Sequence, residues 1–157
     1  MLKANFITAQ EAAEKIQDGS ILCTIGMTLV SASESILKAI EKRFETVGHP
    51  ADITLVHSCG QSDRKDGIQH LAHEGLVKRI VGSHWGLQPR WMEMIANSQV
   101  EAYCLPQGQI AQLYRSMACG LPGKMSKVGL GTFIDPRVEG GKMNDRTKPL
   151  PDLVDIL

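Results

Sequence analysis

The chain of 157 residues lacks the features that mark a membrane protein or a nucleic-acid-binding protein. Its longest uninterrupted apolar run, residues 102–105, is far shorter than the roughly 20 residues that a membrane-spanning helix needs. Its 17 Lys and Arg residues are balanced by 17 Asp and Glu residues, and no basic block occurs. Binding to DNA or RNA rests on many Lys and Arg contacts with phosphates. We therefore expect neither a membrane nor a nucleic acid as a partner.

Paired cysteines and aromatic residues are also scarce. The four cysteines, Cys23, Cys59, Cys104 and Cys119, form no C-x-x-C pair, and the N-terminal segment lacks the apolar core of a secretory signal. These features predict reduced thiols without disulfides and a cytoplasmic location. Because aromatic residues make up only 4% of the chain, the core must be built from Ile, Leu, Val, Met and Ala. The composition and length are typical of one globular domain.

Short β-prone runs alternate with amphipathic segments through the first 120 residues. The runs lie at 21–25, 53–56, 77–81 and 100–105, and helical patterns follow Thr8, Ser31, Gly67, Pro89 and Gln107. Parallel strands need crossover connections, so the alternation predicts an α/β fold, with a mostly parallel sheet and helices on both faces. Ligands of such sheets bind at the carboxyl ends of strands. The turns that start at Gly26, His57, Gly82 and Leu105 are therefore the candidate site.

Two capping boxes are expected at helix starts. Thr8 and Glu11 stand three residues apart ahead of an apolar pattern, and Ser31 and Glu34 repeat that spacing. Gly19 is expected to end the first of these helices. The pattern thus predicts where two helices begin.

The segment after Gly120 is rich in glycine and proline and has few helical periods. We interpret it as a long ordered excursion and not as a linker. Its expected apolar anchors are Val128, Leu130, Phe133 and Ile134.

His70, His73 and Glu74 share one face of the helix expected after Gly67. They suggest a metal site, but zinc hydrolases of the H-E-x-x-H type need a glutamate between two histidines four residues apart. The order here is H-x-x-H-E, with no obvious third ligand. We favour histidines that hydrogen-bond to neighbouring residues, and we predict no metal.

Two further patterns carry little weight by themselves. Adjacent His57, Ser58 and Cys59 suggest a nucleophile beside a base, but neighbouring residues rarely reach that geometry, so we favour a polar cluster at a strand end. Gly129 and Gly131 form a G-x-G without the third glycine or the following helix of a dinucleotide fingerprint. Neither pattern identifies an active site.

Several segments taken together resemble family I coenzyme A-transferases, most closely the N-terminal part of the acetate or propionate (short-chain acyl-CoA:carboxylate) CoA-transferases. The resemblance runs from near Ile7 to the C-terminus. The segments that carry it are LAHEGLVKRIVGSHWG (71–86), EAYCLPQGQIAQLYR (101–115), PG (122–123) and VGLGTFIDPRVEGGKMND (128–145).

The resemblance implies a transfer of coenzyme A from an acyl-CoA to a free carboxylate through a glutamyl-CoA thioester. Coenzyme A is then a substrate, and no metal or organic prosthetic group takes part. The side-chain amide of Gln107 is implied to be an oxyanion donor, and Gly26, Gly129 and Gly131 are implied to bind substrate. Relatives often carry more glycine at the first turn, where Met27 and Leu29 here are expected to crowd a small acyl pocket.

The catalytic glutamate of the family stands in an E-N-G or E-S-G context, and the chain contains neither triplet. We therefore expect residues 1–157 to be the N-terminal part of an alpha-type CoA-transferase domain, without the C-terminal domain that holds this glutamate. Such a fragment is expected to be inactive alone. Its expected partner is the missing half or a separate subunit, in a homo-oligomer when complete. The alternative is a non-catalytic acyl-CoA or nucleotide-binding α/β module.

Overall fold

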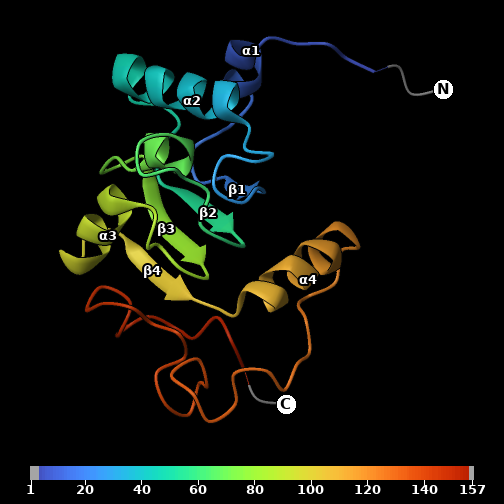
Figure 1. Ribbon diagram of the computed structural model, residues 1–157, viewed down its shortest axis with the longest axis vertical. Coiled ribbons are helices and arrows are strands. Elements are labelled where there is room, and N and C mark those ends of the chain that lie inside the picture. The colour runs from blue at the N-terminus through green and yellow to red at the C-terminus, as the bar shows by residue number, and fades with distance from the viewer. Residues whose placement is uncertain (1–3, 156–157) are drawn as a thin grey trace.

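The computed structural model describes residues 4–155, in which strands alternate with helices (Figure 1). The elements in chain order are α1 (Ala9–Glu14), β1 (Ile21–Thr24), α2 (Glu34–Val47), β2 (Ile53–His57), the 3-10 helix η1 (Gly67–Leu71), β3 (Val77–Gly82), α3 (Pro89–Ala96), β4 (Glu101–Cys104) and α4 (Gln107–Ala118). The predicted α/β class is confirmed.

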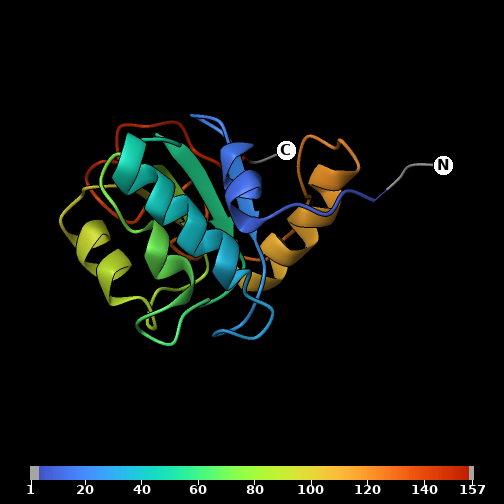
Figure 2. The same cartoon turned by 90° about the horizontal axis from the view of Figure 1, so that it is seen from above.

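The four strands form one sheet in the order β1-β2-β3-β4, and every neighbouring pair is parallel. Each connection leads from one strand to the next strand on the same side. Right-handed crossovers therefore place the connecting helices α2, η1 and α3 on the same face of the sheet. Figure 2 shows α4 set apart from α1, α2 and α3. The sheet therefore carries α4 on one face and the other helices on the opposite face.

Alternate residues of each strand point to opposite faces, and they divide the core into two clusters. Leu55 and Ile80 are fully buried in the larger cluster with α1, α2, η1 and α3. Their neighbours Val56 and Val81 belong to the smaller cluster, which includes Ile110 of α4. Helices on both faces, as predicted, follow from this alternation.

One of the two predicted capping boxes is present. Thr8 Oγ1 accepts a hydrogen bond from the backbone N–H of Glu11, whose carboxylate accepts one from the N–H of Thr8. The helix ends at Glu14, ahead of Gly19. The second box, at Ser31, is wrong, because α2 begins at Glu34 and Ser31 lies in a turn with φ 63°.

The helix expected after Gly67 is only the short 3-10 helix η1. The Ile68 N–H donates to the carbonyl oxygen of Gln61, which closes the preceding loop. The Ile68 carbonyl in turn accepts from Trp91 Nε1 at 2.8 Å. Because the chain leaves helical geometry at Ala72, with ψ 68°, a longer helix does not form.

The excursion after α4 returns to the outer edge of β4. The Cys104 N–H donates to the Gly141 carbonyl at 2.8 Å, and the Met143 N–H donates to the Ala102 carbonyl at 3.0 Å. An antiparallel bridge joins Tyr103 to this same stretch. The excursion is therefore ordered, as expected, and covers one edge of the sheet.

The apolar anchors predicted for the excursion are mostly wrong. Val128, Leu130 and Phe133 are all exposed, and only Ile134 is half-buried. Polar side chains hold this segment in place instead. Asn144 Nδ2 donates to the carbonyl oxygens of Ile95 and Val100 at 3.0 and 2.9 Å. The sequence pattern could not show whether apolar side chains or hydrogen-bonding polar side chains hold this segment in place.

All four cysteines are free thiols, in agreement with the absence of disulfides that the sequence predicts. Within residues 4–155, none of the helices combines the length and the apolar character that crossing a membrane would require.

Candidate functional site

The carboxyl ends of the parallel strands meet at one edge of the sheet, and the turns that follow β1 and β2 are joined there. The Thr28 N–H donates to the Gly60 carbonyl at 2.8 Å. The Cys59 thiol donates to the Gly26 carbonyl at 2.7 Å. These bonds fix the first turn against the second.

Gly26 occupies a backbone position that only glycine accepts without strain. Its φ is 140°, and an added Cβ would lie 2.9 Å from the carbonyl oxygen of Val30. Paired hydrogen bonds between Met27 and Val30 close the turn behind it. The side chain of Met27 is 64% exposed, so it does not fill an enclosed space at this turn.

His57 is fully buried at the end of β2, and it is neutral. Its Nδ1 lies 2.8 Å from the carbonyl oxygen of Cys59, so Nδ1 carries the proton and donates. Burial lowers the pKa of His57 to about 4. Among residues 4–155, Nε2 has no hydrogen-bond partner, and the ring packs against Gly82.

The arrangement excludes a nucleophile–base pair at His57 and Cys59. The imidazole bonds to the backbone of Cys59, whose thiol points to the Gly26 carbonyl. Burial raises the pKa of the Cys59 thiol, which disfavours the reactive thiolate. The favoured interpretation of a polar cluster at the strand end agrees with this geometry.

Gln107 is the first residue of α4, at the carboxyl end of β4. Its side chain is exposed, and no side-chain hydrogen bond caps this helix. Gly129, which has φ 97°, lies beside the preceding residue, because an added Cβ would be 4.0 Å from Pro106 Cγ. The structure thus brings two of the predicted site positions, far apart in sequence, to one place.

Of the other two predicted glycines, Gly131 lies two residues after Gly129, whereas Gly26 lies at the opposite side of the sheet. The Gly131 N–H already donates to Asp135 Oδ2 at 2.7 Å. Gly26 follows β1, whereas Gln107 follows β4, and these are the two outer strands of the sheet. Strand spacing places their ends about 14 Å apart. Tyr114 of α4 nevertheless reaches the end of β1, where its hydroxyl donates to the Thr24 carbonyl at 3.1 Å.

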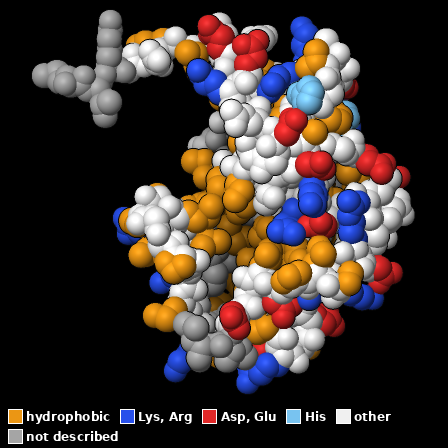
Figure 3. Space-filling model, turned by 180° about the vertical axis from the view of Figure 1, so that it is seen from behind, with side chains coloured by type: hydrophobic (Ala, Val, Ile, Leu, Met, Phe, Trp, Pro, Cys, Tyr) orange, Lys and Arg blue, Asp and Glu red, His pale blue; other side chains and the backbone are white. Residues whose placement is uncertain are grey.

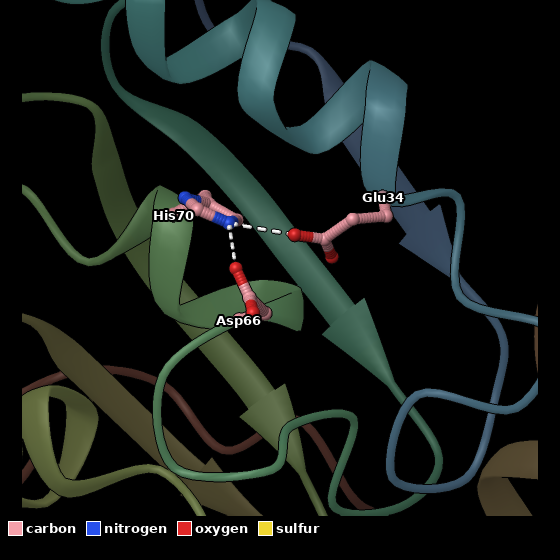
Figure 4. A group of neighbouring side chains, drawn as sticks. All are labelled: Glu34, Asp66 and His70. Carbon is pink, nitrogen blue, oxygen red and sulfur yellow. Dashed lines mark hydrogen bonds and ion pairs between the residues drawn. The ribbon is translucent and has the colours of Figure 1, made fainter.

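A cluster of charged side chains, which sequence spacing did not reveal, lies between α2 and η1 (Figure 4). His70 Nε2 is 2.8 Å from Glu34 Oε1 and 3.2 Å from Asp66 Oδ1. The Lys38 ammonium lies 3.1 Å from Glu34 Oε1 and 3.3 Å from Asp66 Oδ1. A cation therefore already occupies this group, and we assign no metal ligands to it.

The predicted trio of His70, His73 and Glu74 does not come together. His73 Nε2 is instead 2.8 Å from Glu41 Oε1, and Glu74 belongs to neither group of side chains whose ligand atoms converge. Arg90 Nη1 lies 3.5 Å from the same Glu41 oxygen. Both histidines hydrogen-bond to neighbouring residues, as the favoured interpretation expects.

Comparisons with known proteins give consistent matches. The family model described as Coenzyme A transferase matches residues 6–153. The caffeate CoA-transferase of Acetobacterium woodii is 41% identical over 155 residues, and the acetate CoA-transferase YdiF of Escherichia coli K12 is 37% identical over 153 residues. These alignments cover 98% and 96% of this chain, but only 29% and 28% of those proteins.

The fold agrees with the sequence matches. A crystal structure of the acyl-CoA transferase YdiF from Escherichia coli O157:H7, described as a thioester complex with CoA, matches with a TM-score of 0.88 at 35% identity. That match covers 96% of this chain and 30% of the solved one. The chain thus spans less than a third of the length of these relatives, in agreement with the expectation that it corresponds to one part of a longer transferase.

Proposed function

The chain belongs to the coenzyme A transferase family, and from this premise we propose that it forms part of an enzyme that moves coenzyme A from a short-chain acyl-CoA to a free carboxylate. The observation that carries the proposal is the match over residues 6–153. The names of the relatives, which include an acetate CoA-transferase, support a short acyl group. Figure 3 shows that hydrophobic side chains gather in a hollow on one face of the molecule.

The proposed reaction proceeds through two acyl transfers to and from one glutamate. The glutamate carboxylate attacks the thioester carbonyl, the C–S bond breaks, and an acyl-glutamyl anhydride and the CoA thiolate result. The thiolate then attacks the glutamyl carbonyl and releases the acyl group as its carboxylate, which leaves a glutamyl-CoA thioester. A second carboxylate reverses these steps and leaves as the new acyl-CoA.

Each step places negative charge on a carbonyl oxygen, and donors held ready for that charge stabilise it strongly. In our proposal the exposed amide of Gln107 is one such donor. An amide suits this task because it is neutral and does not cancel the charge of the attacking carboxylate. Gly26 would bring the backbone close to the substrate, as glycine permits. Gly129 and Gly131 would shape the loop beside Pro106.

The remaining components are proposed to come from elsewhere. The nucleophilic glutamate would belong to a part that corresponds to the remaining length of the relatives, on the same polypeptide or on a separate subunit. Coenzyme A would be a substrate, and the reaction would need no metal or organic prosthetic group. We propose a cytoplasmic enzyme that is a homo-oligomer when complete, and the free thiols support that location.

A direct assay tests the proposal. A chimera in which residues 6–153 replace the matching part of Escherichia coli YdiF should transfer CoA from acetyl-CoA to propionate and accumulate glutamyl-CoA. The 157-residue chain alone should not turn over, and robust activity from it would contradict the proposal. Calorimetry measures whether the chain alone binds CoA. Tight, saturable binding, combined with a chimera that has no transferase activity, would favour the non-catalytic binding module.

A further inference from the structure

His70 lies between carboxylates on both sides of its ring. Its Nδ1 is 2.5 Å from Glu41 Oε2, and its Nε2 is 2.8 Å from Glu34 Oε1. A neutral imidazole has one N–H donor and one acceptor nitrogen. Because a carboxylate oxygen only accepts, the acceptor nitrogen of a neutral ring would face a repelling lone pair. With both carboxylates ionised, the geometry therefore requires protons on both nitrogens, which is the imidazolium cation.

Glu34 connects this cation to the loop 60–67. Its Oε1 contacts His70, while its Oε2 accepts a hydrogen bond from the Gly67 N–H at 2.9 Å. The adjacent Ile68 N–H donates to the Gln61 carbonyl. The Gln61 side chain in turn donates to the Thr24 carbonyl at 2.9 Å, at the carboxyl end of β1. Hydrogen bonds, joined by the covalent chain at residues 67–68 and within Gln61, thus link His70 to the candidate site.

We propose that doubly protonated His70 is a charge clamp, which fixes the loop 60–67 against α2 and releases it when the imidazolium loses a proton. Loss of one proton leaves one of the two carboxylates without its donor. If Glu34 turns away, the Gly67 N–H loses its acceptor as well. The clamp itself does not depend on the proposed transferase function. Only its consequence, a loosened Gly26 turn and weaker substrate binding at raised pH, rests on that function.

The charges around the ring favour the cation. Three carboxylates contact the ring, namely Glu34 and Glu41 of α2 and Asp66 before η1. Lys38 of α2, His73 after η1 and Arg90 of α3 contact these carboxylates in turn. Burial opposes the charge, but hydrogen bonds to Glu41 and Glu34 outweigh it and raise the pKa of His70 above 6.5. The clamp is therefore complete below pH 6.5 and is lost as pH rises through the raised pKa.

The first measurement is an NMR titration of the 157-residue chain labelled with 15N-histidine. The titration midpoint of the His70 ring nitrogens should lie above 6.5. The His70→Gln spectrum assigns the signals. A midpoint at or below 6.5 would overturn the proposal. This readout needs only the wild-type fold.

The second measurement is hydrogen exchange at the Gly67 and Ile68 amides between pH 6 and 8.5, corrected for the intrinsic rate. Wild-type protection should fall as pH rises, by roughly tenfold for each unit by which the pKa of His70 exceeds 6.5. In His70→Gln the protection should be lower and independent of pH. If that variant does not fold, Glu34→Gln, which keeps the histidine, should show the same loss.

Two matched controls separate the clamp from other histidines. His49→Gln removes an exposed histidine paired with Asp18, and His73→Gln removes a neighbour that bonds to Glu41 through one nitrogen only. Both should keep the pH dependence of loop protection. Protection that is insensitive to pH in the wild type, or that is unchanged in His70→Gln, would refute the clamp. Neither measurement uses CoA, so failure of the transferase proposal would leave both results readable.

Discussion

At the scale of single residues, the proposal gives roles to one exposed amide and one glycine that can be tested separately. The N-cap of α4 is Pro106, and the exposed Gln107 side chain makes no hydrogen bond within residues 4–155, so capping does not account for it. Gly26 has a backbone conformation that other residues rarely adopt. These two positions allow separate tests, one of catalysis and one of backbone geometry.

In the active chimera, Gln107→Ala should leave the fold intact and lower the rate of glutamyl-CoA formation by roughly a hundredfold, the typical loss for one oxyanion donor. Rapid-quench detection of the carboxylate that is released as glutamyl-CoA forms measures this rate. Gln112→Ala, an exposed glutamine on the same helix, should keep the parental rate. Parental turnover in a folded Gln107→Ala chimera would remove Gln107 from the mechanism.

Gly26→Ala should destabilise the chain by about 1 to 3 kcal/mol, because its Cβ would press on the Val30 carbonyl at a strained φ. Urea unfolding followed by circular dichroism measures the free energy of unfolding. Gly86→Ala provides the control, since a Cβ there meets nothing within 4 Å. Equal stability of the two variants would show that the turn relaxes without cost.

At the scale of elements, sequence patterns correctly predicted the features that depend on interactions between residues close in sequence. The alternation of β-prone and helical segments gave all four strands, and the Thr8 capping box closes on itself within one turn. The Ser31 box failed because Glu34 bonds instead to Gly67 and His70, more than 30 residues away. No spacing rule along the chain reveals a partner at that separation.

In the candidate site, too, contacts between residues distant in sequence could not be predicted from local patterns. Resemblance to a family, and not periodicity, pointed to Gln107, and only the folded chain brings Gly129 beside Pro106. The anchors of the excursion were misjudged because apolar residues were expected to fix it. Its attachment is instead a set of hydrogen bonds from Asn144, whose polarity gave no signal in the sequence.

The attachment of the excursion to α3 can be tested at Asn144. Asn144→Asp keeps the shape but replaces a donor to two carbonyl oxygens with a carboxylate. It should destabilise the chain by about 2 kcal/mol at pH 7 and by less below about pH 4, where the acid regains a donor. Urea midpoints at both pH values measure this. Asn5→Asp, at an exposed position, should have little effect.

At the scale of the whole molecule, two buried or half-buried histidines respond to pH with opposite sign. His57 has a lowered pKa because it is buried, and His70 has a raised pKa because carboxylates outweigh its burial. The fold favours the neutral ring of His57 and the charged ring of His70. Both rings therefore have their favoured charge state only within a limited pH range.

Stability should be greatest near pH 6.5 and decline on both sides. Between pH 6.5 and 4, His57 is protonated in the unfolded chain but stays neutral in the folded one. The free energy of unfolding therefore falls by about 3 kcal/mol over this range. Above pH 6.5 the stabilisation from charged His70 is lost as pH rises through its folded pKa. Urea midpoints from pH 4.5 to 9 measure the profile, a range in which most carboxylates stay ionised.

Two variants assign the limbs of this profile. His57→Asn keeps an N–H near the Cys59 carbonyl and should flatten the acid limb, whereas His70→Gln should flatten the alkaline limb. A profile that neither substitution changes would mean that other groups control the pH dependence.

The carbonyl oxygen of Thr24 accepts hydrogen bonds from both Gln61 and Tyr114. A carbonyl oxygen has two lone pairs, so these two donors use its full capacity. One donor belongs to the loop that His70 holds, and the other belongs to the helix that begins at Gln107. This single oxygen atom at the end of β1 therefore connects the loop 60–67 directly to α4.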